Sequence, residues 1–133
     1  MPLSQRLLHL SLEHQTAMKL ARGIRELMPE DDSALPAVAE HIRQIYASDM
    51  LAHFQEEEHH VCPALLEIGR QDLVDRVRDD HKRLGELANA LAEPSVERLE
   101  AFSELLREHV QFEEEEVFEA LEQHAKQKAS AVL

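Results

Sequence analysis

Two segments of this chain, 53–57 and 109–113, carry a histidine followed four residues later by a glutamate. Each segment lies in a long stretch whose apolar residues recur at every third or fourth position, which is the pattern of an amphipathic helix. Residues four apart lie on one face of a helix, one turn from each other. Each pair can therefore direct an imidazole and a carboxylate toward the same point from one direction.

The composition favours a few long helices. At 133 residues the chain is long enough for one domain with a real core, spanning 1–133 with halves of about 1–68 and 69–133. Apolar residues make up 44% and aromatic residues only 4%, with three glycines and five prolines to interrupt the chain. This composition predicts an all-α fold and argues against a β-sandwich.

Charge and cysteine content exclude several classes of partner. The net charge of −13 opposes direct nucleic-acid binding, because a phosphate backbone needs a basic face, and it also disfavours an anionic membrane surface. No apolar run approaches the roughly 20 residues of a membrane span, and the N-terminal segment is too polar for a signal peptide. A single cysteine cannot form an intrachain disulfide, so we expect a cytoplasmic protein.

The apolar pattern predicts four helices. They run from about Ser4 to Met28, Leu35 to Ile68, Gln71 to Ala92 and Val96 to Ala125. Pro29 with the acidic segment 30–33, Gly69, and Pro94–Ser95 mark the connections. Pro63 predicts a kink beyond the first His-x-x-x-Glu pair, and we expect fraying after Lys126. Short connections make neighbouring helices antiparallel, so the predicted architecture is an up-down-up-down four-helix bundle.

Two further histidines, His14 and His81, lie on the apolar seams of the first and third helices. Counting outward from the three connections places His14, His53, His81 and His109 within about one helical turn of a common depth. Glu57 and Glu113 fall in the same layer. The count uses only helix geometry, so it tests independently whether these six side chains can meet.

The chain also repeats itself weakly. Residues 53–66 (HFQEEEHHVCPALL) align with 109–122 (HVQFEEEEVFEALE), and EHQTAMKL around His14 resembles DHKRLGEL around His81. The repeat predicts two helical hairpins related by pseudo-twofold symmetry. Such symmetry is a natural way to build a site for two metal ions.

Four imidazoles and two carboxylates form a mixed nitrogen and oxygen donor set. That set suits iron, manganese or zinc better than magnesium or calcium, which prefer oxygen. Cys62 lies off the seam and supplies no thiolate to the layer. Two facing carboxylates could bridge two cations, each with two histidines, which would leave positions for water, hydroxide, oxo or dioxygen. A lone inward histidine is more often a core residue, but six such groups would make a costly core without metal.

Other residues near the layer have two interpretations. Tyr46 could hydrogen-bond a ligand, reach a metal, or simply pack. His60 could support the site, although a partly exposed surface histidine is the simpler interpretation, and Gly85 either leaves space for a small molecule or allows close helix packing. We assign His9, His41 and His124 to the surface, and Glu56 and Glu58 to a solvated face.

At these positions the sequence resembles the hemerythrin-like (HHE cation-binding) domain family. The resemblance spans about Leu7 to Leu121 and rests on EHQ at 13–15, HFQEEEHHVCPAL at 53–65, DHKRL at 80–84 and HVQFEEEEVFEAL at 109–121. It implies a non-haem di-iron centre, two iron ions joined by an oxo or hydroxo bridge. The implied ligands are His14, His53, Glu57, His81, His109 and Glu113, with the two glutamates bridging.

The sequence departs from the oxygen-carrying members of that family. They have a second histidine one turn from the one on the third helix, whereas Val77 and Gly85 occupy those positions here. The pattern looks more like bacterial members that bind or react with oxygen, peroxide or nitric oxide. Whether the chain is an enzyme is left open by the sequence. A di-iron sensor acting through a protein partner, iron storage or delivery, and a metal-free interaction module are the alternatives.

Overall fold

The computed structural model describes residues 2–26 and 32–132, and within them every regular element is helical. The first helix, α1, spans Leu3–Glu26, and a short 3₁₀ turn at Asp32–Ala34 precedes the second helical run. The predicted end of the first helix at Met28, with Pro29 and the acidic residues up to 31, lies outside the described residues. No described helix has the length and apolar character that crossing a membrane requires.

The second helical run contains two π-helical turns. It comprises α2 (Leu35–Ile45), a π turn (Tyr46–Met50), α3 (Leu51–Glu56), a second π turn (Glu57–Val61) and α4 (Cys62–Glu67). In each π turn a backbone N–H donates to the carbonyl five residues back, as Cys62 does to Glu57. Pro63 lies in the first turn of α4, where a missing N–H costs little. The second π turn therefore begins at Glu57, the last residue of the His-x-x-x-Glu pair, and ends two residues before Pro63. The kink expected near Pro63 stays a prediction.

The predicted connection at Gly69 is observed. Gly69 has a φ of 76°, the left-handed conformation that glycine adopts most easily, and the N–H of Arg70 donates to the carbonyl of Leu65 at 2.9 Å. The third helix, α5, spans Gln71–Ala90 and ends two residues earlier than predicted. Ser95 then caps the last helical run by accepting a hydrogen bond from the Arg98 N–H at 3.1 Å.

The last helical run comprises α6 (Val96–Phe112), a π turn (Glu113–Val117) and α7 (Phe118–Val132). The predictions that this helix ends near Ala125 and frays after Lys126 are wrong, because α7 continues to Val132. Side chains 122–130 are exposed, so the helix is supported there by its own backbone hydrogen bonds and not by the core.

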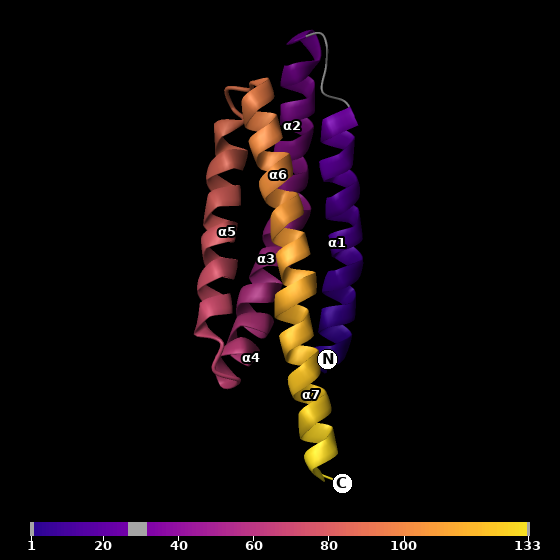
Figure 1. Cartoon of the computed structure of the whole chain (residues 1–133). Coiled ribbons are helices and arrows are strands. Elements are labelled where there is room, and N and C mark those ends of the chain that lie inside the picture. Colours follow the sequence, from indigo (N-terminus) through magenta and orange to yellow (C-terminus); the bar gives the residue numbers. More distant parts are fainter. Residues whose placement is uncertain (1, 27–31, 133) are drawn as a thin grey trace.

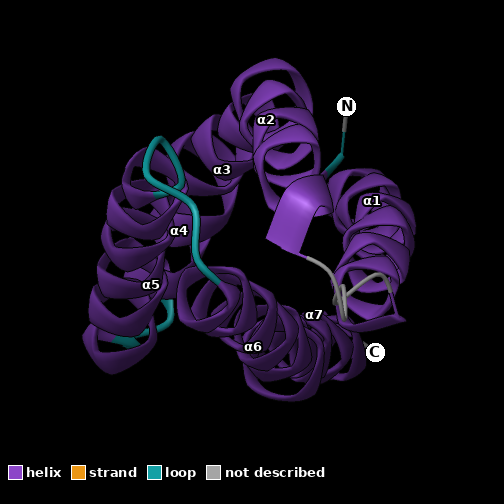
Figure 2. Cartoon of the chain, turned by 90° about the horizontal axis from the view of Figure 1, so that it is seen from above, coloured by secondary structure: helices purple, strands orange, loops and turns teal. Residues whose placement is uncertain are grey.

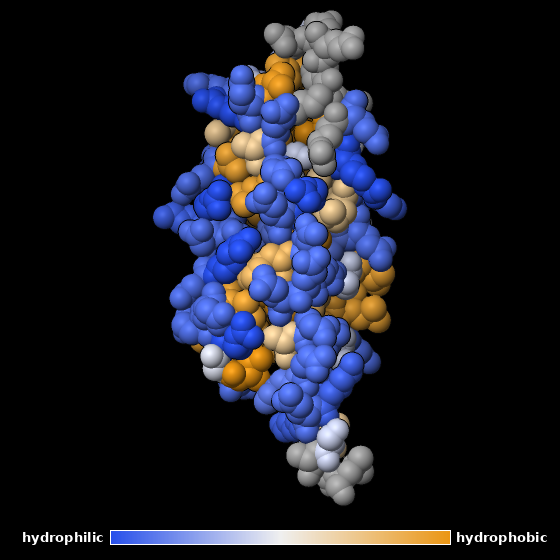
Figure 3. All heavy atoms as spheres, viewed as in Figure 1, coloured by the Kyte–Doolittle hydropathy of each residue, from blue (hydrophilic) through white to orange (hydrophobic). Residues whose placement is uncertain are grey.

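The four helical runs pack around a common centre, seen end-on in Figure 2. α1 packs against α6, and α5 packs against α6 and α4. Figure 1 shows the N-terminus and the C-terminus at the same end of the molecule. In Figure 3, hydrophilic residues cover most of the visible face, with apolar patches between them.

Two apolar clusters form the core. One contains Leu84, Phe102 and Leu106, and the other contains Leu10, Leu65 and Val77. Cys62 is fully buried in the second cluster, so the expectation that it lies off the seam is wrong. The preceding π turn adds a residue to the helical turn and so rotates the next side chain inward. Burial raises the pKa of the Cys62 thiol to about 11.

Candidate metal centre

A layer of polar side chains separates the two apolar clusters. Its members are the six residues singled out by the sequence, which we call the site layer: His14, His53, Glu57, His81, His109 and Glu113. All six are buried, and both glutamates are 0% exposed. Each of the four helical runs contributes to the layer, so only the assembled bundle brings the six side chains together.

The site layer divides into two overlapping groups of four. The first tetrad is His14, His53, Glu57 and Glu113, and the second tetrad is Glu57, His81, His109 and Glu113. Within each tetrad one ligand atom per residue lies within 4.8 Å of all the others. The two tetrads share both glutamates, which is the arrangement that two neighbouring cations bridged by carboxylates require.

The glutamates lie between histidines of different tetrads. Glu57 directs Oε2 to His53 Nε2 at 3.3 Å and Oε1 to His81 Nε2 at 3.0 Å. Glu113 Oε1 lies 3.3 Å from His14 Nε2 and 2.8 Å from His109 Nε2. The Nε2 atom of every imidazole in the layer therefore faces a shared carboxylate.

Each shared glutamate is the first residue of a π-helical turn. Glu57 begins the turn Glu57–Val61, and Glu113 begins the turn Glu113–Val117. An isolated π turn weakens local helical hydrogen bonding and is frequent at functional sites. Its occurrence at the equivalent position of both His-x-x-x-Glu pairs indicates that it serves the placement of these carboxylates.

A second set of acidic residues faces the outer nitrogens of the imidazoles. We call Glu13, Glu58, Asp80 and Glu114 the outer carboxylates. His14 Nδ1 pairs with Glu114 at 3.1 Å, His53 Nδ1 with Glu13 at 3.0 Å, and His109 Nδ1 with Asp80 at 3.0 Å. His81 Nδ1 lies 3.6 Å from Glu58, too far for a hydrogen bond. A carboxylate on one ring nitrogen fixes the tautomer and directs the other nitrogen inward, as in many metal sites.

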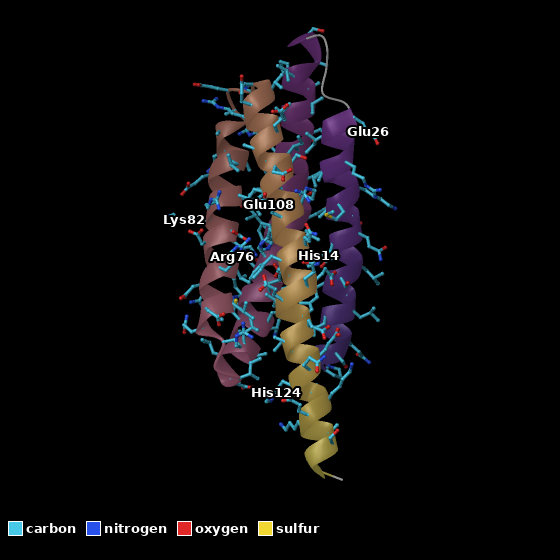
Figure 4. The ribbon with its side chains drawn as sticks, in the orientation of Figure 1. His14, Glu26, Arg76, Lys82, Glu108 and His124 are labelled. Carbon is cyan, nitrogen blue, oxygen red and sulfur yellow. The ribbon has the colours of Figure 1, made fainter. Side chains whose placement is uncertain are left out.

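The outer carboxylates have partners of their own. Arg76 donates to both oxygens of Asp80 at 3.2 and 3.3 Å, and its guanidinium lies 4.4 Å from the centre of the Phe112 ring. Ser11 donates to Glu114 at 2.5 Å, and His9 lies 3.6 Å from Glu13. Figure 4 shows His14 on α1 and Arg76 on α5 at about the same height of the bundle.

Sequence reasoning missed the outer carboxylates. Each stands beside a member of the site layer in the chain: Glu13 before His14, Asp80 before His81, and Glu58 and Glu114 after the two shared glutamates. That adjacency was the available signal. Glu58 was assigned to a solvated face, but it is only partly exposed and faces His81. Glu56 is also only partly exposed and pairs with Arg6 at 2.8 Å.

Unpartnered atoms in the site layer test whether a metal fits. The buried atoms without a hydrogen-bond partner among the described residues are Nε2 of His14 and His109, Oε2 of Glu57, both Oε atoms of Glu113, and Nδ1 of His81. Leaving so many buried polar atoms unpaired is costly unless another group satisfies them. All of them belong to residues of the two tetrads, and only Nδ1 of His81 is directed outward, toward Glu58. The residues present therefore fit a pair of cations that prefer mixed nitrogen and oxygen ligands.

The ionisation of the layer follows from its carboxylates. Burial lowers the pKa of His14, but contacts with Glu113, Glu114 and Glu57 outweigh burial and raise that pKa to about 11. The pKa of His109 likewise lies well above its usual value, because Glu113 and Asp80 outweigh its burial. Burial raises the pKa of Glu57, but Glu113 and the imidazoles bring it well below the usual value. Without metal these carboxylates therefore favour protonated imidazoles, and cations that bind here would displace those protons.

Aromatic rings cover the histidines on different sides. Phe118 stacks on His14 with ring centroids 5.3 Å apart, and Phe54 stacks on His81 at 4.1 Å. A hollow of about 450 Å³ between α1 and the α2–α3 segment reaches His14, His53 and His109. It is lined mostly by apolar side chains, with Glu13 and Asp49 among the polar ones. Solvent-sized molecules can therefore approach the first tetrad.

Tyr46 and Gly85 face each other. A Cβ at residue 85 would lie 2.9 Å from the Tyr46 hydroxyl, so glycine leaves room for that oxygen. Burial raises the pKa of Tyr46, and its hydroxyl forms no hydrogen bond with another described residue. Gly85 therefore allows close packing against Tyr46. Whether Tyr46 reaches a bound ligand or metal stays a hypothesis.

The remaining histidines lie outside the site layer. His9, His41 and His124 are exposed, as their surface assignment predicted, and Figure 4 shows His124 on α7 far from His14. His59 and His60 are exposed as well, which for His60 favours the simpler of its two interpretations. His60 makes no hydrogen bond or ion pair with a described site-layer residue. Val77, one turn from His81, is fully buried in the apolar core, so it supplies no additional ligand.

Comparison with known proteins gives one match. Residues 7–121 match the model of the hemerythrin HHE cation binding domain. The matched region contains the whole site layer and all four outer carboxylates. Neither the curated proteins nor the solved structures contain a match to the chain.

Proposed function

Because the chain belongs to the hemerythrin HHE cation-binding family, we propose that it is a non-haem di-iron protein. His14, His53, Glu57, His81, His109 and Glu113 would hold two iron ions, with Glu57 and Glu113 bridging them. The observation that carries this proposal is the pair of tetrads that share two buried carboxylates, with several of their facing atoms lacking a hydrogen-bond partner. Iron is the ion we propose, while the donor types alone would also accept manganese or zinc.

We further propose that the bundle has up-down-up-down topology with a pseudo-twofold repeat. The contacts of the site support this symmetry. Glu13 pairs with His53 of the same hairpin, as Asp80 pairs with His109. Glu114 pairs with His14 of the other hairpin, and Glu58 takes the equivalent place beside His81.

The proposed ligand is a small molecule: dioxygen, peroxide or nitric oxide. Two bound iron ions would supply the redox chemistry for such ligands. Each tetrad offers two imidazoles and shares two carboxylates, which leaves positions open on a six-coordinate ion. The hollow between α1 and α2–α3 offers an approach to the first tetrad, while Phe54 covers His81 of the second.

The chain's own residues would orient the ligands and exclude water. The outer carboxylates keep the Nδ1 protons of three imidazoles in place, so that each Nε2 faces inward unprotonated when metal is bound. Phe54 and Phe118 restrict the rings by stacking. We propose a cytoplasmic protein with no nucleic-acid or membrane partner, on the strength of its net charge of −13 and its single cysteine.

The alternative functions have less support. A ferritin-like site would use Glu-x-x-His pairs such as Glu57 with His60, but His59 and His60 are both exposed. A metal-free helical module would leave the site layer as a buried polar cluster without compensation. A di-iron sensor that acts through a protein partner uses the same site, and a copurifying partner would favour it.

The experiment that tests the proposal is metal analysis by mass spectrometry of untagged protein purified without chelator. About two iron ions per chain are expected. Reaction of the reduced protein with dioxygen, peroxide and nitric oxide, followed by optical spectroscopy, would then identify the ligand. A folded protein that holds no transition metal and cannot be reloaded with ferrous iron would contradict the proposal.

A further inference from the structure

A second hollow, of about 540 Å³, lies between α1 and α6. The two helices lie side by side in Figure 1, and Figure 4 labels His14 where they face each other. At one end of the hollow Ser11 donates to Glu114, which in turn pairs with His14 Nδ1. His14 of the site layer is thus one of the residues that line this hollow, and its Nδ1 is covered there by Glu114.

Three cationic side chains line the other end. Lys19 and Arg22 come from α1, two to three turns beyond Ser11, and Arg107 comes from α6, two turns before Glu114. Arg107 is held in place by Glu104 and by Gln111, whose Oε1 lies 3.3 Å from Nη1. Lys19 and Arg22 have no hydrogen-bond or ion-pair partner among the described residues. Lys19 and Arg22 thus have no acidic partner among the described residues, and Arg107 is held in a fixed orientation.

The charge of this hollow is unlike that of its surroundings. Its lining has three cations against one carboxylate, and when Glu104, the ion-pair partner of Arg107, is included the formal charge is +1, in a chain whose net charge is −13. The hollow that reaches the first tetrad has two carboxylates and no Lys or Arg. A third, between α5 and α6, has one arginine and three glutamates, and a fourth, beside Tyr46, is neutral. A small anion is repelled by most of this surface and attracted here.

We propose that the hollow between α1 and α6 binds a small oxyanion of the sulfate or phosphate type. Lys19, Arg22 and Arg107 supply the charge, and the side-chain amides of Gln15 and Gln111 in the same lining supply neutral donors. Arginine forms paired hydrogen bonds with tetrahedral oxyanions, which gives the site a preference over chloride. The inference depends on these surface side chains and not on the identity of the metal.

The test is equilibrium dialysis of radiolabelled sulfate against the purified full chain, with sodium chloride at matched ionic strength as competitor. One saturable site per chain is expected. The double variant Arg22→Gln/Arg107→Gln should bind sulfate at least about tenfold more weakly, because it removes two of three cations. A matched double variant, Lys82→Gln/Arg83→Gln, makes the same charge change on exposed positions of α5 and should alter affinity less than about twofold.

Repeating the dialysis after chelator treatment separates this site from an anion bound to iron. Sulfate binding that survives chelation and is lost in Arg22→Gln/Arg107→Gln supports the proposal, whether or not the chain holds iron. Three results would overturn it: no saturable binding, equal displacement by chloride, or equal losses in the two double variants. Binding that disappears on chelation and is unchanged in Arg22→Gln/Arg107→Gln would also overturn it. Circular dichroism of each variant verifies that the helices remain folded.

Discussion

The two halves of the chain supply the same types of donor in the same order but surround them differently. The first, α1 with α2–α4, provides Glu13, His14, His53, Glu57 and Glu58, and the second, α5 with α6 and α7, provides Asp80, His81, His109, Glu113 and Glu114. Both shared glutamates begin a π turn. The residues that correspond between the two halves are those that face the proposed metals, together with the carboxylates beside them.

The differences lie outside that shared set. Among the described residues, only the first half has a further π turn, Tyr46–Met50, and its last three residues line the hollow beside the first tetrad. The equivalent stretch of α6 is regular and contains the buried Phe102 and Leu106. Outside the layer, the exposed His9 faces Glu13, whereas Arg76 anchors the buried Asp80. Equal donors with unequal surroundings would give two metal positions of different accessibility.

The largest expected effect comes from a residue that both tetrads share. Glu113→Ala should abolish metal binding at both positions, from about two ions per chain to nearly none, because its carboxylate serves both groups. Metal analysis by mass spectrometry measures this. The control, Glu115→Ala, removes an exposed glutamate two residues away and should retain the wild-type content. Full metal content in Glu113→Ala would show that this carboxylate does not bridge.

Lower pH should weaken metal binding, because protons compete with metal at His14 in the first half of the chain and at His109 in the second. His14 and His109 have raised pKa values in the metal-free protein, so both are protonated at neutral pH and must lose that proton to bind metal. Affinity should therefore rise with pH, by about tenfold or more per unit between pH 6 and pH 8. Chelator competition at each pH gives the affinity, and calorimetry in two buffers gives the protons released. An affinity independent of pH would contradict this assignment.

Removing an outer carboxylate should reduce metal affinity by different amounts in the two halves of the chain. Loss of such a partner typically costs about 10- to 100-fold in metal affinity. Asp80→Asn should lie near the upper end of that range, because Asp80 is buried and bound to both Arg76 and His109. Glu13→Gln should lie near the lower end, because Glu13 is 40% exposed and water can replace it. Chelator competition measures both, with the exposed Asp79→Asn as control. Equal losses of metal affinity in Asp80→Asn and Glu13→Gln would contradict the proposed difference between the two halves.

The smallest expected effect concerns Tyr46 and Gly85. Replacing a helical glycine by alanine stabilises a helix by about 1 kcal/mol. Gly85→Ala should not gain this in the wild type, because the new Cβ would lie 2.9 Å from the Tyr46 hydroxyl. In a Tyr46→Phe background the stability gain from Gly85→Ala should return. The effect of Gly85→Ala on the free energy of unfolding should therefore differ between the two backgrounds by about 0.5–1 kcal/mol. Urea denaturation measures it. Gly23→Ala, where nothing lies within 4 Å, should gain equally in both backgrounds.

The helices and the site layer were accessible from sequence because both depend on short-range periodicity. A histidine and a glutamate four apart share a helix face whatever the rest of the chain does. Cys62 shows where that reasoning fails, because a π turn five residues earlier shifts the helical register and brings the thiol inward. The predicted end of the last helix near Ala125 was wrong for a different reason. The residues beyond it are exposed and carry no apolar pattern, so the sequence gives no sign that α7 continues to Val132.

The amino-acid pattern alone identifies which six residues could meet, because a helical seam and the length of a connection fix both the face and the depth of each side chain. Which atoms face one another depends on how the helices pack. The pairing of Glu114 with His14 joins residues 100 apart in the chain, and that of Glu13 with His53 joins residues 40 apart. Such contacts depend on the distance and rotation between packed helices. No local pattern encodes these quantities, so the outer carboxylates and the two hollows became visible only in the folded chain.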